Sequence, residues 1–323
     1  MTHGPAVWSS QVWREEAVTW LDDRLAAAGA ARTGAVSQPH LYAWSTVLTA
    51  PTTRGAVWLK APGPETAFEV ALYELLGSVV PDRVLEPIAV DVARGWVLLP
   101  DGGPTLAADA FDEFAEFLPR YGQLQRDLAS HVDTLLEFGL ADMRPAAMPA
   151  RFDEAMVVAE RSRATCGEPA DRAALDRVAG LRGEFVEWCA RLAESPVPAS
   201  LDHNDLHADN IFAMGTKFYD WGDAVVAHPF ASMLMALGFL NYQHGLTATD
   251  PVVTRARDAY LEPFTDLAPR ASLVAEVELA CRVAKAARVL VWDRALRAGA
   301  GEFGRAPLET MLALRADWIS LGA

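Results

Sequence analysis

The chain has 323 residues, 51% of them hydrophobic, so it is long enough to bury a sizeable core and too apolar to stay unfolded. Its 43 acidic and 28 basic residues give a net charge of −15, which argues against nucleic acid or an anionic membrane surface as a partner. Three widely spaced cysteines and no long apolar run argue against a disulfide framework, a structural zinc site and a membrane span. We expect a folded cytoplasmic protein, whose oligomeric state the sequence does not indicate.

The first hundred residues predict a small lobe of mixed α and β structure. Residues 8–28 have apolar side chains at helical spacing, which predicts an N-terminal helix that covers the lobe. Pro64 stands where a second helix would begin, and Gly77 stands near where it would end. Short apolar runs between turn residues predict four strands of one antiparallel sheet, at 44–48, 56–59, 84–90 and 95–99.

The segment from Pro100 to Pro104, with two glycines, is the strongest turn signal in the first half of the chain. Helical patterns follow it to about Glu194, and a short β-like stretch covers residues 201–221. From Pro229 onward the pattern is helical again. We therefore predict an α+β protein with a small lobe at residues 1–103 and a larger, mainly helical lobe at 104–323.

The densest polar stretch runs from His203 to Asn210, and Asp220 follows it after a further apolar segment. Phosphoryl transfer needs a base near the attacking hydroxyl and hard oxygen ligands for the Mg²⁺ ion that bridges the phosphates. Asp205, Asn210 and Asp220 are residues of these types.

The pattern H-x-D-x-x-x-x-N, followed about ten residues later by an apolar residue and D-W, resembles the aminoglycoside phosphotransferase family, whose fold is similar to that of protein kinases. The resemblance implies a bilobal kinase-like fold, ATP and Mg²⁺ as cofactors, and a hydroxylated small molecule as phosphate acceptor. It implies that Asp205 is the catalytic base, that His203 supports the catalytic loop, and that Asn210 and Asp220 bind the metal.

The first lobe extends this resemblance. The strand-like segment ending at Lys60 is similar to the strand that carries the phosphate-binding lysine, and the helix after it would carry a glutamate partner. Lysine is rare in this chain, which favours a specific role for Lys60. Glu65, Glu69 and Glu74 are candidates for the partner. We favour Glu69, because Glu65 in a first helical turn suits the helix dipole.

Nucleotide contacts are also implied by the segment that enters the turn at Pro100. It resembles the last strand before a kinase hinge, so the backbone around Leu99 and Asp101 would hold the adenine, although Asp101 is equally a turn residue. A loop at residues 33–45 would cover the phosphates, with Gly34 and Ser45 as candidate contacts.

The chain departs from the related patterns at several points. Asn204 stands where the family usually has glycine, the G-x-G-x-x-G loop of protein kinases is absent, and so is an A-P-E segment. These absences argue against a protein substrate. Residues 214–217 end like a nucleotide-binding loop but lack its first glycine, so we predict a hairpin turn there.

Other interpretations remain open for the polar stretch. It could be a plain loop, or His203, Asp205, His207 and Asp209 could chelate a transition metal in a hydrolase. His207 suits a supporting role, and Asp223 suits either a metal neighbour or a turn residue. A nucleotide-binding protein with little transferase activity is a further alternative.

The acceptor is predicted from charge. Residues 1–103 carry 11 acidic and 7 basic groups, net −4, which leaves 32 acidic and 21 basic groups, net −11, for residues 104–323. This excess favours a cationic acceptor such as an aminoglycoside over a neutral sugar, nucleoside or macrolide, and an amino alcohol remains an alternative acceptor. The carboxylates expected to bind it lie within 153–160 and at Asp258, Glu262 and Glu278.

Overall fold

The computed structural model describes residues 4–297, 299 and 301–322. The chain divides into two compact units. Unit 1 consists of Met1–Pro104, Phe212–Gly222 and Ala295–Gly299, and unit 2 consists of Thr105–Ile211, Asp223–Arg294 and Ala300–Ala323. An antiparallel sheet organises unit 1 and helices dominate unit 2, which confirms the predicted α+β class.

The sheet of unit 1 has five strands in the order β1-β2-β3-β5-β4, and every neighbouring pair is antiparallel. Because side chains alternate along a strand, Val57 and Leu59 of β3 face one side of the sheet and Lys60 faces the other. The strands are β1 (Ser37–Leu41), β2 (Ser45–Thr52), β3 (Gly55–Pro62), β4 (Ala89–Asp91) and β5 (Trp96–Pro100).

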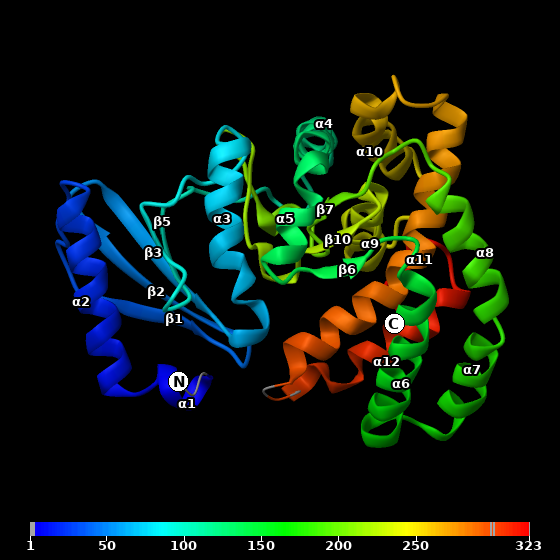
Figure 1. The fold of residues 1–323 in the computed structure, drawn as a ribbon, viewed down its shortest axis with the longest axis horizontal. Coiled ribbons are helices and arrows are strands. Elements are labelled where there is room, and N and C mark those ends of the chain that lie inside the picture. Colours follow the sequence, from blue (N-terminus) through cyan, green and yellow to red (C-terminus); the bar gives the residue numbers. More distant parts are fainter. Residues whose placement is uncertain (1–3, 298, 300, 323) are drawn as a thin grey trace. The chain divides into compact units, whose positions relative to one another are not determined.

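Helices cover both faces of this sheet (Figure 1). On one face lies α2 (Gln11–Ala27), whose Trp13 and Trp20 meet Trp96 of β5 edge-on at 6.0 and 5.6 Å between ring centroids. The predicted helix 8–28 is thus present, but the Ser10 side chain caps α2 and separates it from the short α1 (Pro5–Trp8).

The other face carries α3 (Phe68–Val79), preceded by the 3-10 turn Pro64–Thr66. Gly77 lies near the end of this helix, as predicted, although α3 continues through it to Val79. A single glycine lowers helix stability by only about 1 kcal/mol, and a helix packed against a sheet tolerates that loss.

Two strand predictions were wrong in part. The expected strand 84–90 is reduced to β4 (Ala89–Asp91), because Pro87 has no amide to donate to a ladder and only Val84 forms a bridge, to Phe218. The expected loop 33–45 contains β1, which is short and polar and therefore lacks the apolar alternation that predicts a strand.

Both edges of the sheet are irregular. The edge strand β1 contains Pro39, and its pairing with β2 shifts register between Ser37 and His40. The opposite edge, β4, has three residues, and Arg94 beyond it pairs with Asp91 at 2.8 Å and with Glu16 at 3.3 Å.

Unit 2 contains a three-stranded sheet in which β10 lies between β6, its parallel neighbour, and β7, its antiparallel neighbour. The strands are β6 (Ala141–Met143), β7 (Ser200–Asp202) and β10 (Val225–Ala227). The helices around it are α4 (Phe111–Leu128), α5 (Val132–Glu137), α6 (Met148–Cys166), α7 (Pro169–Ala179), α8 (Arg182–Ala193), α9 (Met233–His244), α10 (Pro251–Leu261), α11 (Arg270–Leu296) and α12 (Ala306–Leu312).

A short hairpin joins β8 (Ile211–Phe212) to β9 (Lys217–Phe218). Gly215 and Thr216 in its turn have φ values of 81° and 50°. The left-handed backbone suits a tight hairpin turn and confirms the turn predicted at residues 214–217. Within the described ranges, none of the helices is long and apolar enough to cross a lipid bilayer.

Candidate active site

In unit 1, the ammonium of Lys60 on β3 is held by two carboxylates. Lys60 Nζ lies 2.7 Å from Glu69 Oε1 and 2.5 Å from Asp220 Oδ1. The Glu69 side chain is fully buried, whereas the Asp220 side chain is 50% exposed. Burial acts to lower the pKa of Lys60, but the two carboxylates outweigh it and hold that pKa above its ordinary value. Lys60 is therefore a charged donor between a buried and an exposed carboxylate.

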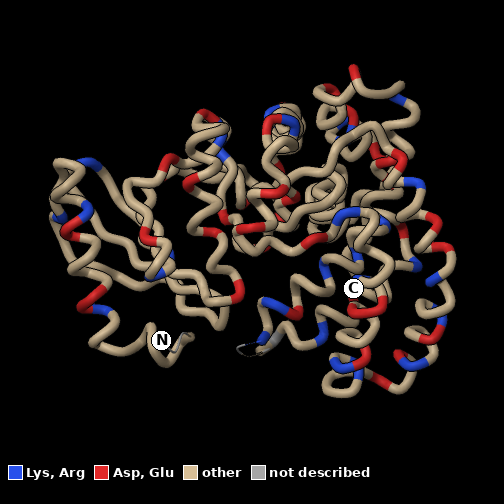
Figure 2. The backbone as a smooth tube through the Cα atoms, in the orientation of Figure 1, with Lys and Arg blue, Asp and Glu red and all other residues tan. Residues whose placement is uncertain are grey.

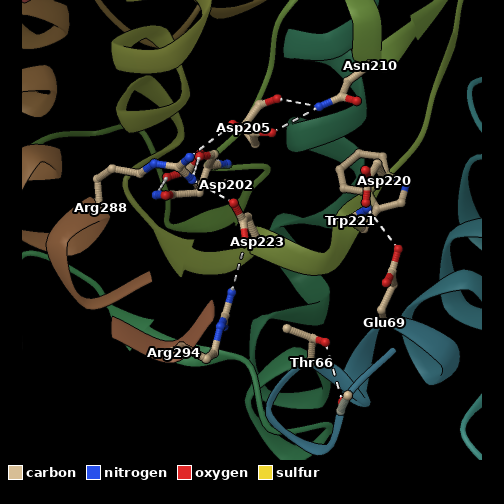
Figure 3. A network of polar contacts seen from close by, with 12 residues as sticks. Thr66, Glu69, Asp202, Asp205, Asn210, Asp220, Trp221, Asp223, Arg288 and Arg294 are labelled. Atoms are coloured by element: carbon tan, nitrogen blue, oxygen red, sulfur yellow. Dashed lines mark hydrogen bonds and ion pairs between the residues drawn. The ribbon is translucent and has the colours of Figure 1, made fainter. Parts of the chain in front are cut away.

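The structure distinguishes the three candidate glutamates. Glu69 contacts Lys60 and accepts the backbone amide of Trp221 at 3.1 Å on the same oxygen, Oε1 (Figure 3). Glu65 instead pairs with Arg297, and Glu74 is exposed. Burial raises the pKa of Glu69 to about 7, although the neighbouring Lys60 opposes the shift. The contact expected between Lys60 and Glu69 is thus present, and their role in phosphate binding stays a prediction.

Asp220 lies two residues after the end of β9 and has a φ of 63°, in the left-handed region that residues other than glycine rarely adopt. Its backbone amide donates to the Tyr73 hydroxyl at 3.3 Å. Such backbone outliers persist where surrounding contacts determine them, and they cluster at functional sites. The strained backbone, held by α3, presents the Asp220 carboxylate to Lys60.

The remaining predicted nucleotide contacts lie in the same unit. Leu99 is buried and pairs with Trp58 in the sheet. The Asp101 amide donates to Ala56 O at 3.1 Å, and its carboxylate accepts the amide of Gly103 at 3.2 Å, as in a capped turn. The Asp101 side chain is thus occupied within the turn, and the adenine contact through this backbone stays a prediction.

Ser45 begins β2 beside the β1–β2 turn, and its carbonyl accepts the amide of Tyr42 at 2.9 Å. The rings of Tyr42 and Trp44 in this turn stack at 5.1 Å between centroids. Gly34 packs against Pro51, ahead of β1. The predicted phosphate-covering loop therefore has an aromatic turn where protein kinases have glycines, and the roles of Ser45 and Gly34 stay predictions.

In unit 2, the catalytic-loop candidates follow β7. Asn204 has a φ of 58°, and its backbone amide and side-chain amide donate to Asp202 at 2.8 and 3.2 Å. Burial raises the pKa of the Asp202 carboxyl despite these donors. The family prefers glycine at position 204, and the geometry explains both choices, because glycine and asparagine are the residues that most readily take a left-handed backbone.

The side chains of Asp205 and Asn210 meet across this loop (Figure 3). Asn210 Nδ2 donates to Asp205 O at 2.8 Å and to Asp205 Oδ2 at 3.2 Å. His207 Nε2 lies 3.5 Å from the same Oδ2 and 3.2 Å from Asn210 Nδ2. The structure thus brings the predicted base, the predicted metal ligand and His207 together around one carboxylate oxygen.

His203 is fully buried beneath this loop. Its backbone amide donates to the Tyr121 hydroxyl at 3.0 Å, and Tyr121 contacts the Ser232 hydroxyl at 2.8 Å. Gln125 donates to Leu201 O at 2.8 Å and joins the same network. A buried position of this kind suits the supporting role expected of His203, which stays a prediction.

Two arginines of α11, Arg288 and Arg294, belong to the site without having been predicted from the sequence. Arg288 donates to Asp205 Oδ1 at 3.2 Å, to Asp223 Oδ2 at 2.7 Å and to the Asn204 carbonyl at 2.8 Å, and Arg294 lies 3.9 Å from Asp223 Oδ1 (Figure 3). The signal for Arg288 is a charged residue within the apolar run from Ala286 to Val291, which predicts a buried charge with a partner.

The contacts with Arg288 and His207 keep the Asp205 carboxylate of this loop ionised. Burial acts to raise the pKa of the Asp205 carboxyl, but Arg288, followed by His207, outweighs it and holds that pKa well below the usual range. Asp223, which sequence analysis left between a metal neighbour and a turn residue, is an ion-pair partner of both arginines.

The donor groups fit Mg²⁺ in chemistry. Mg²⁺ prefers oxygen ligands and is usually bound by one or two carboxylates together with substrate phosphates. Asp220 offers a half-exposed carboxylate and Asn210 an amide oxygen. In the part of the chain that the structure describes, no group of three or more His, Cys, Asp or Glu could hold a metal by itself. The residues thus suit an ion that arrives with a nucleotide.

Comparison with known families places this geometry in context. The sequence matches the model described as phosphotransferase enzyme family over residues 58–273, which is more than half of the chain. No curated protein matches the sequence.

Solved structures similar to this chain include three small-molecule phosphotransferases. A macrolide 2′-phosphotransferase from Brachybacterium faecium is 18% identical, with a TM-score of 0.53 over 88% of this chain and 97% of that one. An amicoumacin kinase in complex with AMP-PNP, Ca²⁺ and Ami is 12% identical, with a TM-score of 0.62 over 98% and 96%. A choline kinase from Streptococcus pneumoniae is 12% identical, with a TM-score of 0.61 over 92% and 98%. At these identities the similarity shows the kinase-like α+β fold.

Proposed function

Because the chain belongs to the phosphotransferase enzyme family, whose members are ATP-dependent small-molecule kinases, we propose that it transfers the γ-phosphate of ATP to a hydroxyl group, with Asp205 as the base. The observation that carries this proposal is the Asp205 carboxylate, whose Oδ2 faces Asn210 and His207 while Arg288 holds Oδ1. We assign nucleotide binding to residues 1–103 and acceptor binding to residues 104–323.

In the nucleotide half, Lys60 donates to the α- and β-phosphates, and Glu69 fixes its position from the buried side. Asp220 and Asn210, which belong to residues 104–323, would hold Mg²⁺, and the ion would neutralise charge on the phosphate oxygens. The backbone around Leu99 and Asp101 holds the adenine, and Ser45 contacts the phosphates. The half-exposed Asp220 carboxylate next to a charged lysine supports this assignment.

In the acceptor half, Asp205 orients the hydroxyl and receives its proton. A carboxylate with a low pKa is a weak base, so its main contribution is to orient the nucleophile rather than to remove the proton early. Catalysis then consists mainly of positioning and charge stabilisation, as expected for phosphoryl transfer. His203 holds the loop from beneath.

The acid excess that favoured a cationic, aminoglycoside-like acceptor finds limited support in unit 2. Figure 2 shows acidic and basic residues interspersed along its helices. The carboxylates expected to bind the cation have arginine partners: Asp153 with Arg182, Glu160 with Arg163, Asp258 with Arg257, Glu262 with Arg270 and Glu278 with Arg282. Ion-paired carboxylates attract a cationic ligand less strongly than free ones, so the prediction stands on net charge alone.

A second acceptor class is favoured by a shallow apolar surface beside His207, whose enclosed cavity measures only about 10 Å³. Its lining is mostly apolar and includes Phe111, Phe114 and Phe239. The Phe239 ring lies 4.2 Å from the His207 ring, between centroids. Because His207 lies 3.5 Å from Asp205, the apolar part of a hydroxylated acceptor such as a macrolide would pack against this surface rather than enter it.

One panel experiment separates these classes. ADP release is measured with kanamycin, erythromycin and choline as acceptors, and the product is checked by mass spectrometry for one added phosphoryl group. Asp205→Asn serves as the inactive control. Acceptor-dependent ADP release by the wild type, lost in Asp205→Asn, supports the proposed function. ATP binding without transfer to any hydroxylated acceptor would instead favour a nucleotide-binding protein with little transferase activity.

A further inference from the structure

Arg288 joins three parts of unit 2 that are distant in sequence. It extends from α11 to the carbonyl of Asn204, to Oδ1 of Asp205 and to Oδ2 of Asp223, at 2.8, 3.2 and 2.7 Å. Its side chain is 7% exposed. A buried cation with three oxygen acceptors is a specific arrangement, because an unpaired charge at this depth would be strongly destabilising.

The chemistry of the contact requires a guanidinium group. Its planar fork presents several N–H donors at fixed angles, so Arg288 contacts two carboxylates and a carbonyl at once. The guanidinium carbon also lies 4.8 Å from the ring centroid of Trp292, one turn further along α11, which holds the side chain in place. An ammonium group at this position could not reproduce all three contacts.

The contacts divide the two oxygens of Asp205 between different neighbours. Oδ1 is held by Arg288, and Oδ2 lies 3.2 Å from Asn210 Nδ2 and 3.5 Å from His207 Nε2. Arg288 also donates to the carbonyl of Asn204, the residue directly before Asp205, whose backbone is in the left-handed conformation. Both the backbone before the carboxylate and the rotation of the carboxylate are therefore fixed from one side.

We propose that Arg288 is a positioning residue of the phosphoryl transfer, which fixes Asp205 through Oδ1 so that Oδ2 receives the proton of the acceptor hydroxyl. This inference rests on the proposed function. In the reaction, the acceptor O–H bond breaks and its proton passes to Oδ2. The acceptor oxygen bonds to the γ-phosphorus, and the bond from phosphorus to the β–γ bridging oxygen breaks, so ADP leaves with that electron pair.

Asp223 completes the arrangement from the opposite side. Its Oδ2 accepts from Arg288, and its Oδ1 lies 3.9 Å from Arg294. The aspartate holds the guanidinium in the orientation that contacts Asp205. Asp223 therefore acts on the base through Arg288, which explains a carboxylate so close to Asp220 in sequence without a metal-binding role.

The experiment compares Arg288→Met and Arg288→Lys with the matched control Arg282→Met, which removes an arginine from the same helix where it pairs with Glu278 and lies over Trp188. Steady-state kinetics use ATP and the panel acceptor that the wild type phosphorylates fastest. Because displacement of a catalytic group by about 1 Å can cost about 10²-fold, we expect kcat to fall about 10²-fold in Arg288→Met and about tenfold in Arg288→Lys. KM for ATP should stay within about threefold of the wild type, and Arg282→Met should behave as the wild type.

A structural role is distinguished by chemical rescue. Methylguanidine should restore part of kcat in Arg288→Met, whereas methylamine should not, because only the guanidinium can bridge the acceptors. A folded Arg288→Lys or Arg288→Met enzyme with kcat within about threefold of the wild type would overturn the inference. The inference would also be overturned if kcat fell in proportion to the melting temperature and methylguanidine did not restore it. If Arg288→Met does not fold, Arg288→Lys decides alone. Absence of transfer in the wild type would refute the proposed function instead.

Discussion

Replacement of Glu69 by glutamine tests the nucleotide half with little change in shape. Glu69 is fully buried, and its Oε1 accepts hydrogen bonds from both Lys60 and the Trp221 amide. Oε2 makes no hydrogen bond within the described part of the chain. Glutamine keeps the accepting oxygen but removes the charge, so Lys60 retains Asp220 as its charged partner. We expect the ammonium of Lys60 to be held mainly by Asp220, so that it competes more strongly with Mg²⁺ for that carboxylate.

The magnitude follows from the single contact that is weakened. A hydrogen bond to a charged group contributes about 1.5–3 kcal/mol, which corresponds to a fall of about 10- to 150-fold in kcat/KM for ATP. The fold should tolerate the change, because burial raises the pKa of Glu69 to about 7 and a neutral side chain avoids that cost of burying charge.

The assay is ADP release at varied ATP and Mg²⁺ concentrations, with melting temperature as a check on folding. Glu65→Gln and Glu74→Gln are matched controls, because they make the same chemical change at the exposed glutamates of the same segment. We expect a higher apparent KM for ATP and Mg²⁺ in Glu69→Gln and unchanged kinetics in the controls. Equal kcat/KM in all four proteins, or an equal loss in the controls, would refute the assigned role of Glu69.

Three further predictions concern the base, the metal and a buried lysine. Asp205→Asn should lower kcat by about 10²–10⁴ while ATP binding, measured by calorimetry, is retained; turnover within about tenfold of the wild type would contradict its role as base. Asp220→Asn should raise the Mg²⁺ concentration needed for half-maximal turnover, and an unchanged titration would move the metal role to another residue. Lys285, buried where Nζ donates to Ala313 O at 2.8 Å and Asp317 O at 2.6 Å, has a pKa lowered to about 8 by burial. Because the unfolded chain holds this proton more tightly, wild-type stability should rise by about 3 kcal/mol relative to Lys285→Met as the pH increases from about 8 to 10.5. Urea unfolding of both proteins at several pH values measures this rise, and parallel stability curves would refute it.

The local patterns predicted much of the fold. Period-two and period-3.6 spacing located α2, α3 and the strands β2, β3 and β5, because their buried faces must be apolar wherever they pack. The strand β1 and the residues 84–88 were misjudged for the opposite reason. An edge strand needs few apolar side chains, and an apolar run that contains proline does not have to pair.

The site was predictable where a short motif carries it. Asp205, Asn210 and His207 lie within six residues, so their proximity follows from the loop itself. Glu69 was predicted as the partner of Lys60 because Glu65, in the first helical turn, suits the helix dipole. The structure shows the contact between Lys60 and Glu69. Arg288 lies 83 residues after Asp205, and its partner depends on how α11 packs, which spacing along the chain does not reveal.

The irregular edges of the sheet in unit 1 have a consequence for how the protein behaves at high concentration. A free strand edge can recruit the same strand of another molecule, which leads to cross-β association. Here the proline and the register shift in β1 interrupt the row of amides that such pairing requires. At the other edge, three residues and the charged pair of Arg94 with Asp91 leave too short a template. We therefore expect the sheet to resist intermolecular strand addition, so that this part of the protein stays dispersed at high concentration.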